Sequence, residues 1–129
     1  MSTLDDLSAA ERQRRMDRLM TFEQAWRDAD IHYRDDVRAA IEDPVLLRQV
    51  DLNWYAHQRN WAEAAIAALE LGDADVAAAH DLAKAANKTV SDARKNAEKI
   101  AAVIRKVGKA AEALTKVLDT VAKAKKAGG

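Results

Sequence analysis

Residues 51–72 read DLNWYAHQRNWAEAAIAALELG, and Trp54, His57 and Trp61 follow one another there at spacings of three and four. These spacings belong to one face of an α-helix and not to a strand. We therefore predict a helix over residues 44–71, and we interpret its two tryptophans as packing residues rather than as a ligand site. The apolar face of this helix consists of Leu47, Val50, Trp54, His57, Trp61, Ala64, Ala68 and Leu71.

The composition also favours an all-α fold. The chain has 129 residues with only four glycines and one proline, too few for a protein built of strands and tight turns. The composition leans on Ala, Leu, Glu, Arg and Lys, which are good helix formers. The length suits a single all-helical domain over residues 1–129. Because the chain has no cysteine, disulfides, thiolate catalysis and cysteine zinc sites are excluded.

Capping residues predict where the first two helices begin. Ser8 followed by Glu11 has the form of a capping box, which opens a helix over about 9–42. Asp43-Pro44 then combines an N-cap residue with a proline suited to the first helical position. Since the residue before a proline avoids the α region, the chain must at least kink at this point.

A third helix is predicted over about 74–126. Gly72 is the expected C-terminal cap of the second helix, and Asp73 is the expected N-cap of the third. Gly108 costs about 1 kcal/mol relative to Ala, which does not end so periodic a helix. The apolar residues alternate at spacings of three and four, a heptad pattern: Val76, Ala79, Ala83, Ala86, Val90, Ala93, Ala97, Ile100, Ile104, Val107, Ala111, Leu114, Leu118 and Val121.

The short connection at 72–75 predicts that the second and third helices are antiparallel neighbours. Folding the chain back there pairs Trp61 with Ala86 and His57 with Val90. The first helix either continues the line of the second, which gives an elongated antiparallel helical hairpin, or reverses at the proline, which gives a three-helix bundle. Both folds carry a long C-terminal heptad helix, and the sequence leaves the choice open.

Charge is divided unevenly although the net charge is zero. Residues 1–83 carry nine Arg, no Lys and 17 acidic residues, a net charge of −8. Residues 84–129 carry ten Lys, two Arg and four acidic residues, a net charge of +8. The basic third helix could therefore pack on the acidic helices of its own chain, or bind an acidic partner, an anionic membrane or nucleic acid.

The best metal-like pattern is Asp28, His32 and Asp36, whose spacings of four place three potential ligands on one helix face. The same segment interleaves its acids with Arg27 and Arg34, which is typical of a solvated face. No second helix supplies the matching ligands of a di-metal bundle site. We therefore predict no metal site and no cofactor.

The remaining histidines do not form a catalytic set. His57 is expected to be a buried neutral side chain bonded to a polar neighbour, with a pH-sensing role open to it. His80 lies just after the turn, beside Asp81, and is expected at the surface. No nucleophile, base and acid fall in an order that suggests a pocket, so we expect the protein not to be an enzyme.

The function we expect is that of a helical protein-protein interaction module, such as an adaptor, chaperone, immunity protein or regulator. It would present a coiled-coil-like face to an acidic protein partner or to a second copy of itself. Apolar positions that widen the third helix's stripe would dock, and exposed lysines would select the partner. These partner-binding residues are Val103, Ala110, Val117 and Ala124, with Lys109, Lys116 and Lys123.

Two alternatives use the same cationic amphipathic helix. It could associate with anionic membranes, although its apolar face lacks aromatic residues and is rich in Ala. Non-specific nucleic-acid binding is less well supported, because no aromatic or base-reading set accompanies the lysines. Neither a signal peptide nor a transmembrane segment is evident, so we expect a cytoplasmic protein, with export by a signal-less route left open.

Overall fold

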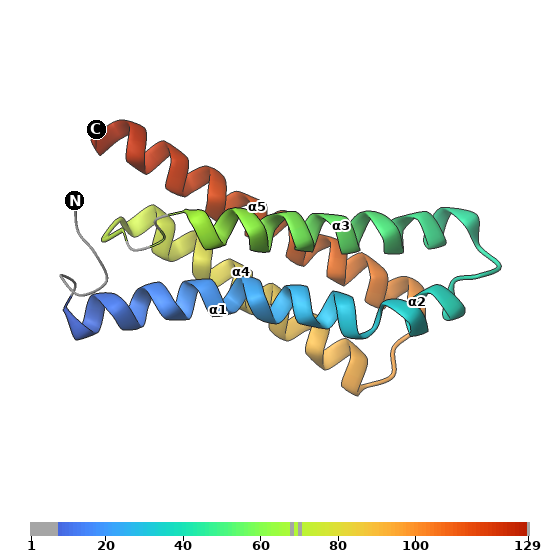
Figure 1. Ribbon diagram of the computed structural model, residues 1–129. Coiled ribbons are helices and arrows are strands. Elements are labelled where there is room, and N and C mark those ends of the chain that lie inside the picture. Colours follow the sequence, from blue (N-terminus) through green and yellow to red (C-terminus); the bar gives the residue numbers. More distant parts are fainter. Residues whose placement is uncertain (1–7, 68, 70, 129) are drawn as a thin grey trace.

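A computed structural model describes residues 8–67, 69 and 71–128, and its ordered elements are all helices (Figure 1). The helices are α1 (Ala9–Ile31), α2 (Tyr33–Ala39), α3 (Pro44–Ile66), α4 (Ala74–Lys95) and α5 (Ile100–Gly128). The prediction of an all-α protein is confirmed. Neither the hairpin nor the three-helix bundle describes the arrangement, however, because four long helices lie alongside one another.

The four long helices run in alternating directions (Figure 1). Helix α3 returns along α1 after the turn at Asp43-Pro44, so the chain reverses there and does not merely kink. Helix α5 has the most extensive packing: it lies against α4, against α3 and, less closely, against α1. Helices α3 and α4 are not close neighbours, so they do not form the predicted antiparallel hairpin, although His57 and Val90 line the same pocket.

The predicted third helix is broken into α4 and α5 at residues 96–99, which corrects the expected continuous helix over 74–126. Ala97 adopts a left-handed conformation with φ of 51°. The amide of Glu98 donates to the carbonyl of Ala93 at 3.0 Å, and that of Ala97 donates to Arg94 at 3.1 Å. This pair of bonds is a Schellman motif, which ends a helix and reverses the chain.

All three predicted N-caps form. The Ser8 hydroxyl accepts from the amide of Glu11 at 3.2 Å, and the Asp43 carboxylate accepts from Leu46 at 3.1 Å. Asp73 accepts from the first amides of α4 at 2.8 and 3.1 Å. Each bond satisfies a donor that the helix itself leaves free, so these starts follow from local chemistry.

The C-terminal end of α3 lies earlier than predicted. The helix ends at Ile66 with Ala67 as its cap, and Gly72 does not adopt a left-handed conformation. The connection to α4 is instead tied to α1, because the buried Arg18 guanidinium donates to the carbonyls of Leu69 at 2.6 Å and Leu71 at 2.9 Å. A long-range contact therefore replaces the expected glycine cap.

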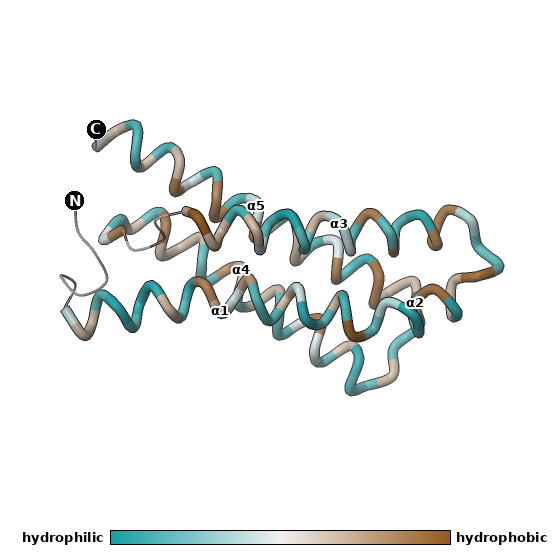
Figure 2. The backbone as a smooth tube through the Cα atoms, viewed as in Figure 1, coloured by the Kyte–Doolittle hydropathy of each residue, from teal (hydrophilic) through white to brown (hydrophobic). Residues whose placement is uncertain are grey.

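The core follows the apolar stripe of α5, which is the most amphipathic of the helices (Figure 2). Its stripe is wide because three helices of the same chain cover it. The largest cluster lies toward the α3–α4 connection and contains Phe22, Ala25, Ala64, Leu69, Val76, Ala79, Ala83, Leu114, Val117 and Val121. A second cluster, at mid-bundle, contains Ala29, Val90, Ala93, Val103, Val107 and Ala110. Among the described residues, no helix combines the length and apolar character needed to cross a bilayer.

Candidate functional site

Most of the predicted partner-binding positions on α5 are buried inside the chain. Val103, Ala110 and Val117 are at most 4% exposed and belong to the core clusters, and Ala124 packs partly buried beside them. The reason is that the second neighbour expected for the widened stripe comes from the same molecule. Docking through these side chains would require the bundle to open. Lys109, Lys116 and Lys123 are exposed on α5, and Lys116 and Lys123 line a groove between α5 and α3.

Exposed apolar side chains gather on α3 instead. Val45, Leu52, Tyr55 and Ile66 are 81, 50, 64 and 87% exposed. At about 100° per residue they fall within an arc of about 80°, on the side of α3 opposite its buried residues. We call these four residues the α3 outer face.

Two hollows adjoin the α3 outer face. One, of about 630 Å³, is formed by α3 alone and includes Leu52, Tyr55 and Arg59. The other, of about 580 Å³, is a groove between α3 and α5. Its floor includes small residues such as Gly108 and Ala111, which leave room between the two helices.

The inner side of α3 carries a row of polar side chains that bond to the backbone of α5. Asn53 Nδ2, His57 Nε2 and Asn60 Nδ2 lie 2.9, 3.0 and 3.1 Å from the carbonyl oxygens of Ile104, Val107 and Ala111. All three side chains are at least 95% buried. We call this row the polar seam; its two asparagines were not among the residues predicted from the sequence. Their spacing of four and three with His57 was the available signal.

The hydrogen bond of His57 fixes its tautomer. A carbonyl oxygen only accepts, so Nε2 carries the hydrogen and Nδ1 is left as an acceptor. Nδ1 is buried and has no hydrogen-bond partner among the described residues. Burial lowers the pKa of His57 below its ordinary value of 6.5, which keeps the ring neutral. The expectation of a buried neutral histidine is therefore confirmed, but one of its nitrogens is unsatisfied.

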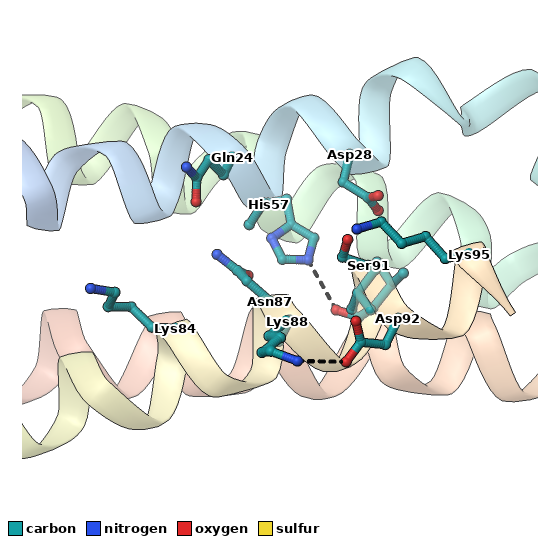
Figure 3. A pocket seen from close by; sticks show the side chains of 13 residues that line it. Gln24, Asp28, His57, Lys84, Asn87, Lys88, Ser91, Asp92 and Lys95 are labelled. Carbon is teal, nitrogen blue, oxygen red and sulfur yellow. Dashed lines mark hydrogen bonds and ion pairs between the residues drawn. The ribbon is translucent and has the colours of Figure 1, made fainter.

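A pocket of about 540 Å³ lies over His57 between α1 and α4 (Figure 3). Val107 and Ala110 of α5 contribute to its apolar floor. Its polar lining comes from Gln24, Asp28, Lys84, Asn87, Lys88, Ser91, Asp92 and Lys95. In Figure 3, the unbonded nitrogen of His57 points to the side where Asn87 and Gln24 lie.

Two residues of the metal-like sequence pattern, Asp28 and Asp36, bind the guanidinium group of Arg94. Asp28 accepts from Nε of Arg94 at 3.0 and 3.1 Å, and Asp36 accepts from its two terminal nitrogens at 3.0 Å each. Burial disfavours the charged guanidinium, but the bonds to Asp36 and Asp28 outweigh this and raise the pKa of Arg94. His32 lies beside Asp28, with Nδ1 2.8 Å from its carbonyl oxygen and 3.4 Å from its carboxylate. Within the described part of the chain, no group of acids and histidines could hold a metal ion.

Trp54 lies in an aromatic cluster at the edge of the α1–α3 interface. Its ring centroid is 5.3 Å from that of Trp26, 5.6 Å from Tyr33 and 5.1 Å from Tyr55. Its indole nitrogen donates to Asp30 at 3.1 Å. Trp61 packs partly buried against the largest core cluster. Both tryptophans thus act in packing, as predicted, although neither is fully buried.

His80 is buried, which corrects its expected surface position. Only 7% of the residue is exposed, and Nε2 lies 2.9 Å from the hydroxyl of Thr21. Asn87, one of the pocket residues, donates to the carbonyl of Thr21 at 2.9 Å. The sequence prediction failed because α1, which covers this side of α4, lies 59 residues away from His80 in the chain.

The comparisons with known proteins give no family. No protein-family model matches the chain, and neither the curated proteins nor the solved structures compared with it gave a match. The function must therefore be argued from the surface and the pocket themselves.

Proposed function

We propose that the protein is a non-enzymatic interaction module that docks through the α3 outer face. One observation carries the proposal: four large apolar side chains, each at least half exposed, share one face of one helix. A solvated helix normally turns polar residues to this side. Apolar side chains gathered on one exposed helix face are typical of an interaction surface, whereas single exposed apolar residues are common on any protein. The exposed Arg48, Arg59 and Glu63 lie among these four residues and supply the polar part of the face.

The occupant we propose is a second copy of the chain. In an antiparallel pairing about a twofold axis near Tyr55, Val45 at one end of α3 meets Ile66 at the other. The same register sets Arg48 opposite Glu63 of the second copy, and both of these residues are exposed. Such a pairing is self-complementary in charge as well as in apolar contact, as a twofold interface requires.

The expected dimer is weak. Stable complexes bury about 800 Å² on each partner, and a single helix face offers less than that. The groove between α3 and α5 lies beside the α3 outer face and can enlarge the buried area. It does so only if side chains of the second copy fill the space above its small residues. We therefore expect association that depends on concentration rather than a permanent dimer.

Sedimentation equilibrium of the full chain, from low micromolar to near-millimolar concentration, tests this proposal. Arg48→Glu places a like charge opposite Glu63 and should weaken the dimer by about tenfold, which corresponds to about 1.4 kcal/mol. Combining it with Glu63→Arg restores an opposite pair and should recover most of the affinity. Recovery of affinity in the double variant identifies the register, because it requires residues 48 and 63 to face each other across the interface.

A matched pair of variants tests whether association depends on the α3 outer face or on any exposed apolar side chain. Leu52→Ser lies on the α3 outer face, whereas Leu82→Ser removes an exposed leucine of α4, which is 63% exposed, from elsewhere on the surface. Only Leu52→Ser should weaken association. A monomer at every concentration, or equal loss from both variants, would overturn self-association through α3.

A further inference from the structure

The pocket over His57 has the features of a ligand site that the proposed interaction surface does not use. It opens between α1 and α4, which pack against each other much less closely than α4 and α5 do. Its volume of about 540 Å³ is within the range of small-molecule sites. The α3 outer face lies on the opposite side of α3 from His57, so the two sites are separate.

The floor of this pocket holds an acceptor that the protein does not satisfy. His57 is 2% exposed, and its Nδ1 is the only buried side-chain nitrogen or oxygen without a hydrogen-bond partner in the described part of the chain. Leaving such a group unpaired is unfavourable, because it has lost its hydrogen bonds to water without gaining others. Gln24, on the side to which Nδ1 points, is exposed and can move to admit a ligand. A hydroxyl or N–H group placed there would donate to Nδ1.

The charge left over in the pocket is positive. Arg94 is shared by Asp28 and Asp36, which leaves these three groups with one net negative charge, and Asp92 is paired with Lys88 at 3.0 Å. Lys84 and Lys95 outweigh that negative charge. Lys95 makes no ion pair with the described residues, and in Figure 3 its side chain extends toward Asp28 and His57. Ser91, four residues earlier on the same helix, also lines the pocket. Its hydroxyl and the ammonium group of Lys95 together can donate to one anionic group.

We propose that this pocket binds a small organic anion that also carries a hydroxyl or N–H group. The hydroxyl or N–H donates to Nδ1 of His57, and the carboxylate or phosphate is held by Lys95 and Ser91. The polar seam contributes indirectly, because the bond to Val107 keeps the hydrogen of His57 on Nε2. The ligand therefore meets a fixed acceptor at one end and a cation at the other.

Nitrogen-detected NMR of the full-length protein near neutral pH tests the proposal, with glycerol 3-phosphate and lactate as probes. Both should shift the Nδ1 resonance of His57 and the amides lining the pocket on α1 and α4 in a saturable way. Sulfate and glycerol each supply one of the two groups, because sulfate carries no hydroxyl at this pH, so each should bind at least tenfold more weakly. Lys95→Gln should weaken the two probes by about tenfold. Lys109→Gln, a change of an exposed lysine outside the pocket, should leave binding unchanged.

Three results would overturn the proposal. Neither hydroxylated anion shifts the Nδ1 resonance at millimolar concentration, which would mean that water alone serves this atom. Sulfate binds as well as glycerol 3-phosphate, which would mean that surface lysines alone hold the anion. Lys109→Gln weakens binding as much as Lys95→Gln, which would mean that binding depends on the net charge of the protein and not on Lys95. Because Lys95 is exposed, its variant is expected to fold normally.

Discussion

Helix α5 packs against α4 and α3 in two different ways. Toward α4 the contact is apolar and built from small and branched side chains, such as Ala93 and Val103, which are 0 and 4% exposed. Toward α3 it contains the polar seam, in which side-chain donors meet backbone carbonyls of α5. Apolar packing stabilises by area and tolerates small shifts, whereas a hydrogen-bonded row also fixes the register of the two helices.

This difference predicts that the largest single loss of stability comes from the apolar core. Leu114 of α5 is fully buried in the largest cluster. Leu114→Ala removes its packing and leaves a cavity, so the free energy of unfolding should fall by about 2–5 kcal/mol. Urea denaturation measures the change. Leu118→Ala, at a partly buried position in the next turn, is the matched control and should cost less.

Removing a member of the polar seam should cost less than emptying the core. Asn60→Ala eliminates the bond to Ala111 and the acceptor 3.3 Å from the Thr115 hydroxyl. The carbonyl of Ala111 can still bond within its own helix, so we expect a loss of about 1–3 kcal/mol in urea denaturation. Gln58→Ala, on the exposed side of α3, serves as the control. A loss of only a few tenths would mean that apolar contact alone holds α3 on α5.

The pH dependence of stability tests the buried histidines. Burial lowers the pKa values of both His57 and His80 below 6.5, against the opposing effects of Val107 and Asp28 on the first, and of Asp81 and Asp17 on the second. Below pH 6.5 the unfolded chain binds protons that the folded chain does not. Stability is therefore complete above this pH and falls as the pH decreases.

Each histidine contributes up to about 1.4 kcal/mol per pH unit to this loss. Unfolding by urea near neutral pH and one pH unit below 6.5 measures it. His80→Gln removes one of the two contributions, and its side chain can still bond to Thr21. The pH dependence of the free energy of unfolding that remains in this variant is then due to His57 of the polar seam. A free energy of unfolding that does not fall below pH 6.5 would contradict the burial of both rings in neutral form.

The helix starts could be predicted from sequence because each depends on one side chain and a neighbouring amide. Ser8, Asp43 and Asp73 all cap as expected. The break between α4 and α5 could not be predicted in this way. It centres on Ala97, an alanine in a left-handed conformation that usually belongs to glycine. The heptad pattern also continues through the break, so periodicity alone indicated one helix.

The partners of each helix face were harder to predict than the faces themselves. A heptad stripe shows which side is buried but not which helix covers it, and the stripe of α5 was assigned to an external partner because its own neighbours were unknown. Asn53 and Asn60 interrupt the apolar face of α3 in sequence, yet they bond to α5 in space. The pocket could not be predicted at all, since its lining comes from all four long helices.

The smallest predicted effect concerns Gly108, where the polar seam and the helix propensity of α5 oppose each other. Gly108→Ala should favour the helix by about 1 kcal/mol. The added Cβ, however, would lie 3.1 Å from Asn53 Oδ1. Asn53 cannot easily yield, because Oδ1 accepts from Gln49 at 2.8 Å and Nδ2 donates to Ile104 at 2.9 Å. In the native background we therefore expect no net gain.

A double-mutant cycle separates these two contributions. In an Asn53→Ala background the obstructing oxygen is gone, so Gly108→Ala should now stabilise the protein by about 1 kcal/mol. The free energies of unfolding of the four proteins give a coupling of about the same size. Equal effects of Gly108→Ala in both backgrounds would show that the asparagine does not set the distance between α3 and α5. A positive coupling would mean that the glycine is needed because a hydrogen-bonded side chain fills the space its Cβ would occupy.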